Sequence, residues 1–242
     1  MKKNVIGLIL VIGICMCACG GQEKDTKVNQ QEVTKVEQEI CSYTVNLVQG
    51  TKTEDGSIDV VYPQLEGWEN TEAQERWNQE FLNALELQED SQTAEYEIYT
   101  IKPRIMTQTE ELLSILVEGT YFYKGAAHPY GYAYTYNIDM KTGEARYLSQ
   151  QSEEMVNGIA SELLAGNYTV ESQFKEIAIS DLFWVDEGDV LDESRIFNEL
   201  QSCDYALEYN PTCYSYWRED KIGIIFSTNH ALGDYAILEV NQ

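Results

Sequence analysis

The sequence predicts an α+β fold in which two or more helices pack on a mainly antiparallel sheet. Runs with apolar residues at every second position, typical of strands, recur between residues 40 and 242 and are separated by turn-forming residues. Stretches with apolar residues at helical spacing stand apart from these runs and do not alternate with them one by one. Strict alternation would predict a parallel sheet, so its absence favours antiparallel pairing.

Each strand and helix is predicted from its own local pattern. The predicted strands are 41–48, 57–62, 96–101, 112–123, 205–209, 213–218, 222–226 and 234–240, and a hairpin lies between 119 and 148. The first two predicted helices begin with a residue that can cap them and continue with apolar residues on one face. The predicted helices start at Asn70 or Thr71, at Ser152 and at Asp192, with a short helix inside 174–183.

The most distinctive segment is the hairpin between Gly119 and Leu148. After the loop 125–129, which contains His128, four tyrosines share one strand face: Tyr130, Tyr132, Tyr134 and Tyr136. The opposite face carries Gly131, Ala133 and Thr135, whose small side chains let another element approach closely. The tyrosine stripe has two interpretations. It is a core face, which we favour for most of its members, or an exposed platform for sugar rings or a protein.

The N-terminus has the pattern of a bacterial lipoprotein signal. Lys2 and Lys3 precede an apolar run over 5–14 that is too short to span a bilayer as a helix. A small residue precedes Cys19, which we predict to carry acyl chains such as palmitate, and Cys17 is the second candidate. Plain secretion, with cleavage after a small residue, is the alternative.

Three regions follow from this pattern. Residues 1–18 are the predicted lipoprotein signal peptide, and 19–39 form a polar, lipidated, flexible tether without an aromatic residue. Residues 40–242 are long enough to bury one sizeable core and form a single α+β domain, or two subdomains over 40–110 and 111–242. The protein is expected on the extracytoplasmic face of the cell membrane, held there by its lipid.

Several motifs resemble one extracytoplasmic domain family without an assigned activity. These are Gly-Ala-Ala-His-Pro at 125–129 with the aromatic strand and Lys-Thr-Gly-Glu at 141–144, and the segments 214–217, 223–226 and 230–235. The family is the RsiV-type extracytoplasmic domain, which forms the outer part of a lysozyme-sensing anti-sigma factor and accompanies the catalytic domain of the peptidoglycan deacetylase PdaC. The resemblance covers about 40 to 242 and marks His128 as a characteristic position.

Two departures from the family limit what the resemblance implies. Thr228 and Asn229 stand where members often have a tyrosine followed by an acid. No anti-sigma segment or transmembrane helix is expected before the domain, so we do not expect this chain to hold a sigma factor. The Asp-His-His metal set that a deacetylase of the PdaC kind needs is also missing from the pattern.

The cysteines and histidines offer few candidates for chemistry. Cys203 and Cys213 form a disulfide or remain two buried thiols, and both alternatives stay open. A zinc site would need His128 and His230 to meet, with carboxylates such as Asp139 or Asp234, but the spacing does not demand it. We favour a structural role in which the His128 ring bonds the loop backbone, and we predict no metal and no cofactor.

Charge decides which partners are plausible. The chain has 16 basic and 41 acidic side chains and a formal net charge of −25. Such a surface repels nucleic acid and anionic lipid headgroups and attracts cationic partners, although solubility alone also explains it. The negative charge is locally dense in the acidic clusters at 186–189 and 192–193.

Together these observations predict a non-enzymatic lipoprotein that binds a cell-wall-associated or cationic partner. The partner is a basic protein such as lysozyme or the glycan of the wall, with His128, Tyr130, Tyr132 and Tyr134 as candidate binding residues. Two alternatives are an envelope enzyme that acts on peptidoglycan through His128 and nearby carboxylates, and a spacer or assembly lipoprotein.

The Cys19→Ala variant should not incorporate a fatty-acid analogue in growing cells, because the acylated sulfur is gone. Metabolic labelling followed by detection of the purified protein measures this. The Cys17→Ala variant is the matched control and should keep its label. Labelling of the Cys19→Ala variant would rule out this choice of cysteine.

Overall fold

The computed structural model describes residues 41–85, 95–171, 177–183, 189–204 and 213–241. Residues 39–242 form one compact unit. The predicted signal peptide, the tether and the predicted strand at 205–209 lie outside the described residues. No described helix is long and apolar enough to cross a membrane.

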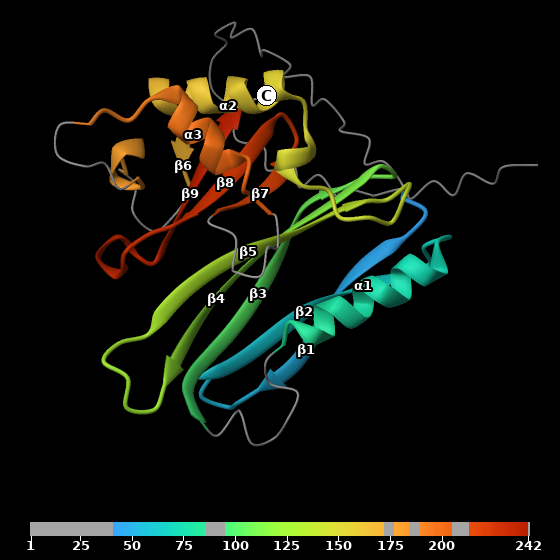
Figure 1. Cartoon of the computed structure of the whole chain (residues 1–242). Helices are drawn as coiled ribbons and strands as arrows, with labels where there is room; N and C mark the ends of the chain where they lie inside the picture. The colour runs from blue at the N-terminus through green and yellow to red at the C-terminus, as the bar shows by residue number, and fades with distance from the viewer. Residues whose placement is uncertain (1–40, 86–94, 172–176, 184–188, 205–212, 242) are drawn as a thin grey trace, which may run out of the picture. The chain divides into compact units, whose positions relative to one another are not determined.

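The described strands form two sheets, which confirms the α+β class with mainly antiparallel pairing (Figure 1). The first sheet has the order β1-β2-β3-β4-β5 and the second has the order β6-β9-β8-β7. Among these described strands, only β2 and β3 pair in parallel. The strands are β1 (Thr44–Lys52), β2 (Ile58–Glu66), β3 (Tyr96–Gln108), β4 (Leu112–Tyr123), β5 (Tyr130–Asp139), β6 (Thr169–Val170), β7 (Cys213–Arg218), β8 (Lys221–Ser227) and β9 (Tyr235–Asn241).

Helices α1 and α2 begin at the residues predicted to cap them, and α3 begins where a further helix was predicted. The helices are α1 (Thr71–Asn83), α2 (Glu153–Ala165) and α3 (Glu193–Leu200), with short 3-10 turns η2 (Leu148–Gln150), η3 (Ile179–Asp181) and η4 (His230–Leu232). Asn70, Ser152 and Asp192 each accept a hydrogen bond from a backbone N–H in the first turn. Gly166 ends α2 in the left-handed conformation, which glycine adopts at little cost.

The elements pack in layers. Helix α1 covers part of one face of the first sheet, where Phe81 lies 4.8 Å from the Tyr136 ring. The opposite face meets the second sheet, with Leu116 and Ala133 packed near Tyr216 and Ile225. Helices α2 and α3 cover the other face of the second sheet (Figure 1). Strand β4 is therefore buried on both faces, and all six residues of 112–117 are buried, five of them apolar and the sixth Ser114.

Residue 110 is not a structural boundary. Strands β3 and β4 pair along most of their length on either side of it, so a division into 40–110 and 111–242 would cut through the first sheet. The change from one sheet to the other falls instead between β5 and β6.

The small-residue face of β5 allows the second sheet to approach, as the sequence predicted. A Cβ atom added at Gly131 would lie 3.3 Å from the Tyr235 ring and 3.4 Å from the Gly233 carbonyl oxygen. Beyond it, Asn137 and Ser114 are buried and hydrogen-bonded to each other at 2.7 Å. The Asn137 amide donates to the Ser215 carbonyl oxygen at 2.7 Å, so polar groups as well as apolar ones fix the register of the two sheets.

On the tyrosine face of β5, one tyrosine ring packs over a glycine of the neighbouring strand β4. Tyr132 stands opposite Gly119, and its hydroxyl donates to the Thr100 carbonyl oxygen at 2.9 Å. A Cβ atom at Gly119 would lie only 2.2 Å from that oxygen and 2.3 Å from the Tyr132 ring. Glycine therefore lets the ring lie flat across the sheet, as aromatic residues do over strand glycines.

The Gly119→Ala variant should lower the free energy of unfolding by about 1–3 kcal/mol, because the new methyl group overlaps backbone and a packed ring. Chemical unfolding followed by circular dichroism measures this. Gly158→Ala on α2 is the matched control: its methyl group meets nothing within 4 Å and should raise stability by up to about 1 kcal/mol. Equal effects of the two variants would contradict the packing described.

Candidate functional site

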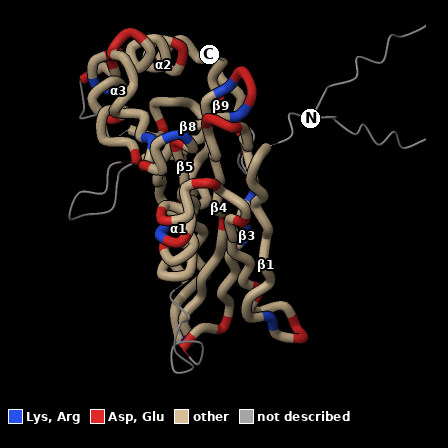
Figure 2. Tube along the Cα trace, turned by 90° about the vertical axis from the view of Figure 1, so that its right-hand side faces the viewer, with Lys and Arg blue, Asp and Glu red and all other residues tan. Residues whose placement is uncertain are grey.

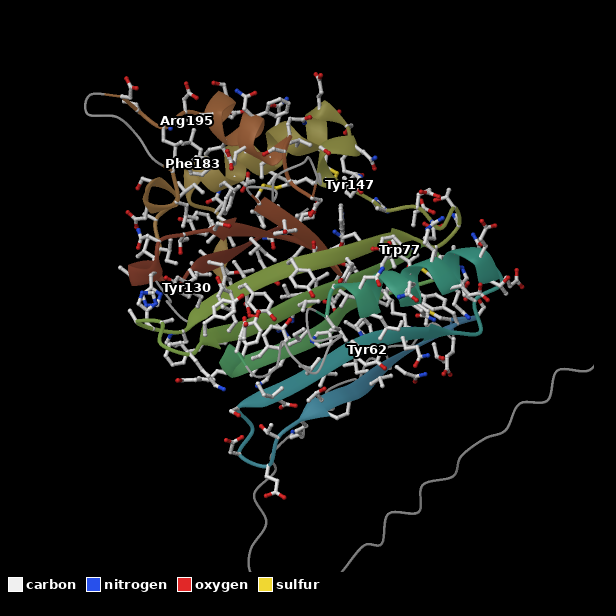
Figure 3. All side chains as sticks on the ribbon, turned by 60° about the horizontal axis from the view of Figure 1, so that its bottom comes forward. Tyr62, Trp77, Tyr130, Tyr147, Phe183 and Arg195 are labelled. Carbon is white, nitrogen blue, oxygen red and sulfur yellow. A yellow bond between two sulfur atoms is a disulfide. The ribbon has the colours of Figure 1, made fainter. Side chains whose placement is uncertain are left out.

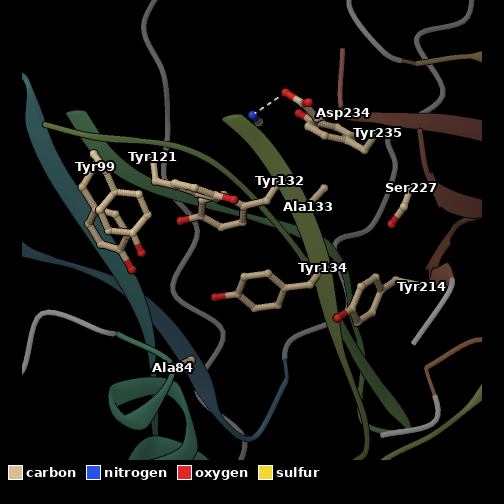
Figure 4. A pocket seen from close by; sticks show the side chains of 12 residues that line it. Ala84, Tyr99, Tyr121, Tyr132, Ala133, Tyr134, Tyr214, Ser227, Asp234 and Tyr235 are labelled. Carbon is tan, nitrogen blue, oxygen red and sulfur yellow. Dashed lines mark hydrogen bonds between the residues drawn. The ribbon is translucent and has the colours of Figure 1, made fainter. Parts of the chain in front are cut away.

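A cleft of about 450 Å³ runs along the outer edge of β5. Figure 4 shows that its side chains come from both sides of the strand, with Tyr132 and Tyr134 on one side and Tyr214 and Tyr235 on the other. The lining residues are mostly tyrosines: Tyr99, Tyr121, Tyr123, Tyr132, Tyr134, Tyr214 and Tyr235, with Ala84, Gly131, Ala133, Ser227 and Asp234. We call this the tyrosine cleft.

The backbone of β5 contributes to the cleft because β5 is an edge strand of its sheet. Gly131 donates its N–H to the Asp234 carboxylate at 2.8 Å, so this N–H points away from β4. In an antiparallel pair the direction of the backbone groups alternates along the strand, and the N–H and C=O of Ala133 therefore also face outward. Further along, the Asn137 carbonyl accepts from the Arg146 N–H at 2.8 Å.

The tyrosine stripe divides between core and surface. Tyr136 packs against α1, with Trp77 6.3 Å and Phe81 4.8 Å from its ring. Tyr132 and Tyr134 are half-buried and their rings lie parallel, 6.2 Å apart, at the cleft. Tyr130 keeps 39% of its surface exposed near the hairpin apex (Figure 3). The stripe is therefore neither wholly core nor wholly surface: Tyr136 belongs to the core, and Tyr130 is exposed.

Burial keeps these tyrosines neutral. It raises the pKa of the Tyr134 hydroxyl well above its ordinary value and that of Tyr136 to about 12. Burial, followed by the Asp204 charge, raises the pKa of Tyr214 as well. The hydroxyls therefore stay protonated at physiological pH and can both donate and accept hydrogen bonds.

The two histidines meet although 102 positions separate them along the chain. The rings of His128 and His230 stack 3.6 Å apart at an interplanar angle of 15°, and Tyr130 lies 4.7 Å from His128. His128 Nδ1 lies 3.3 Å from the Pro129 carbonyl oxygen, which gives the ring the loop-backbone contact predicted for it. His230 Nδ1 lies 3.0 Å from an Asp234 oxygen, and the second Asp234 oxygen holds Gly131.

This histidine pair lies near the protein surface, and nearly half of the His230 side chain is exposed. Asp139, the other acid considered for a zinc site, lies at the opposite end of β5 and caps the turn that follows. Within the described part of the chain, no group of three or more His, Cys, Asp or Glu side chains has the arrangement of a metal site.

A second cleft of about 390 Å³ lies beside the histidines. Its polar lining includes His230, Asp234, Glu118 and Glu171. Glu118 is already engaged, because Arg104 lies 2.8 Å from its carboxylate and the Tyr235 hydroxyl donates to it at 3.0 Å.

Acidic side chains are spread over the described surface, beyond the three that line the second cleft. Figure 2 shows acidic positions on the helices and at several loop ends, with fewer basic positions between them. Of the predicted clusters, Asp189, Asp192 and Glu193 are exposed, and 186–188 lie outside the described residues.

Asp204 connects β5, η2 and β7 through hydrogen bonds, and no sequence pattern predicted this role. Its carboxylate accepts hydrogen bonds from the Ser215 N–H, the Ser215 hydroxyl, the Leu148 N–H and the Thr135 hydroxyl. Burial nevertheless outweighs these donors and raises the pKa of this carboxyl to about 6. A positive φ of 63° places Asp204 in the left-handed region, which aspartate tolerates better than most residues.

A disulfide links Cys203, next to Asp204, to Cys213 and so connects the segment after α3 to the start of β7. Both cysteines are fully buried in the core between the helices and the second sheet. Cys41 is half-buried beside the other core, and its thiol donates to the Gln108 carbonyl oxygen at 3.5 Å. Cys19 lies outside the described residues.

The fold and the cleft together define an α+β domain with two packed sheets and an aromatic site at an edge strand. No protein-family model and no curated protein matches the chain. Solved structures with a similar fold include two members of the DUF3298 family. The first, from Bacteroides fragilis, is 13% identical with a TM-score of 0.46, and the match covers 83% of this chain and 89% of that one. The second, from Pseudomonas aeruginosa, is 11% identical with a TM-score of 0.42, and the match covers 82% and 88% respectively.

The pKa of Asp204 predicts how stability depends on pH. Because its pKa is higher in the folded protein (about 6) than its ordinary value of 3.8, the folded state binds this proton more tightly. Its contribution is complete below about pH 4 and is lost as the pH rises through 6, a change of about 3 kcal/mol at most.

The Asp204→Asn variant should lack this loss of unfolding free energy between pH 4 and 7, since the amide does not titrate. Urea unfolding at several pH values measures the difference from the parent protein. The exposed Asp189→Asn variant is the control and should follow the parent curve. A parent slope that persists in Asp204→Asn would show that other groups produce it.

Proposed function

We propose that this chain is a non-enzymatic binding module on the outer face of the cell membrane. In this proposal a lipid on Cys19 anchors it, and residues 20–39 hold the folded domain away from the bilayer. Its partner is a cationic, cell-wall-associated protein of the lysozyme kind or the glycan of the wall.

The observation that carries this proposal is the chemical character of the tyrosine cleft. Among the described residues its only carboxylate is Asp234, and both oxygens of that carboxylate already have partners in Gly131 and His230. Aromatic faces and neutral hydroxyls provide contact area and hydrogen bonds, which suit binding. General acid–base chemistry needs a titratable group directed at the ligand, and the carboxylate of the described lining has both oxygens engaged.

The charge of the chain supports a cationic partner. A formal net charge of −25 produces a field that speeds the encounter with a basic protein and repels acidic ones. Exposed acids on α2, α3 and the connecting loops belong to this field (Figure 2).

A second candidate function is an envelope enzyme acting on peptidoglycan. The second cleft favours it, because His230, Asp234, Glu118 and Glu171 line one concave surface and His128 stacks on its rim. An acid and a base from this set would be needed for hydrolysis, and the partners of Glu118 and Asp234 described above oppose that use. Release of soluble products from cell-wall sacculi separates the functions, since a binding module releases none.

Isothermal titration calorimetry with purified hen lysozyme should show binding that weakens strongly as the salt concentration rises, because exposed charges are screened. Cytochrome c, a basic protein of similar size, is the control for non-specific attraction and should bind more weakly. No heat with lysozyme at low salt, or equal binding of both proteins, would remove the lysozyme-like partner.

A further inference from the structure

We propose that the tyrosine cleft is a saccharide site that takes a short, neutral oligosaccharide. The inference rests on the proposed function as a binding module and deepens it by naming the ligand class and the residues that hold it. Its volume of about 450 Å³ falls within the range of about 300–1,000 Å³ that small-molecule sites occupy.

The first argument is the aromatic walls of the cleft. Sugar rings present patches of C–H groups that pack against flat aromatic faces. Tyr132 and Tyr134 lie parallel along β5, and Tyr214 faces Tyr134 across the strand with 6.4 Å between ring centroids. Neighbouring ring contacts hold Tyr121 and Tyr132 6.0 Å apart, so the walls are preorganised before a ligand arrives.

The second argument is the set of hydrogen-bonding groups between the rings. The outward N–H and C=O of Ala133 have no hydrogen-bond partner among the residues that the structure describes, and neither does the Tyr214 hydroxyl. The Ser227 side chain adds another hydroxyl to the same lining. Donors and acceptors set between apolar faces match a ligand that has hydroxyl groups around an otherwise apolar ring.

Charge restricts the ligand further. Asp234 is the only charged group among the lining residues that the structure describes, and Glu118 lies close by through its bond to Tyr235. With no lysine or arginine in the lining to compensate, a sulfated, phosphorylated or uronic-acid sugar would meet like charge. A neutral saccharide avoids this repulsion.

The structure disfavours the other ligand of an edge strand, an extended peptide that adds to the sheet. Strand addition needs a run of free backbone groups. Here the Gly131 N–H already donates to the Asp234 carboxylate, and the Asn137 carbonyl already accepts from the Arg146 N–H. The chain itself therefore limits the free edge to the short stretch around Ala133.

The experiment uses the folded protein with ring-¹³C-labelled tyrosine and the neutral probe triacetylchitotriose. We expect the ring signals of Tyr134 and Tyr214 to shift with saturating amplitude, and the signal of Tyr62 on β2 to stay in place. The anionic sugar trigalacturonate should cause no shift. This measurement on the parent protein does not depend on how any variant folds.

Variants then locate the site. Tyr134→Ala should weaken triacetylchitotriose binding about tenfold, the effect of losing one aromatic contact, whereas Tyr62→Ala should change it by less than about twofold. Tyr214→Phe should weaken binding without loss of the ring, because only the hydroxyl is removed. Thermal unfolding of each variant confirms that it is folded before binding is compared.

Three outcomes would overturn the inference: no tyrosine shift at about 10 mM probe, shifts confined to tyrosines outside the cleft, or shifts caused instead by an acetylated, amidated Thr-Val hexapeptide. Lysozyme binding that persists in any of these cases would leave the proposed function standing. Saccharide binding without lysozyme binding would leave the cleft assigned and identify wall glycan as the partner.

Discussion

The close approach of the second sheet to β5 is the constraint on which the rest of the structure depends. Gly131 and Ala133 carry too little side chain to hold the sheets apart, so Tyr235 and Ile237 reach the strand. Where the side chains become polar, Asn137, Ser114 and Ser215 bond one another in a buried, satisfied network. A larger or unpaired group at any of these positions would separate the sheets or leave a buried donor unsatisfied.

The same approach creates both clefts. Because the second sheet meets β5 at an angle to its free edge, side chains of β7, β8 and β9 stand beside tyrosines that belong to the first sheet (Figure 4). Asp204 holds this arrangement from behind by bonding Thr135 on β5 and Ser215 on β7. At the other end of β5, Asp234 connects the second sheet to the strand by accepting a hydrogen bond from the Gly131 N–H. The two aspartates thus bind β5 at Gly131 and at Thr135, on either side of Ala133.

Particular residues show how far the sequence could predict this site. The alternation along β5 identified Tyr132 and Tyr134 on one face and Gly131 and Ala133 on the other, because side-chain direction in a strand follows directly from position. The same alternation could not divide the stripe, since burial of Tyr136 depends on its packing against Trp77 and Phe81 of α1, which lie far from it in the sequence. Asp204 gave no signal, because a single aspartate after a cysteine resembles many surface loops.

The sequence by itself determined the local structure: where the three helices begin, the strand periodicity and the small-residue face of β5. These features depend on interactions between residues close together in the chain, so pattern and capping chemistry suffice to predict them. Only the tertiary structure decided that His128 stacks on His230, that Cys203 bonds Cys213, and that tyrosines of both sheets surround one cleft. The histidine contact and the cleft join residues about one hundred positions apart, and they form only when two sheets pack in one register, which no local pattern specifies.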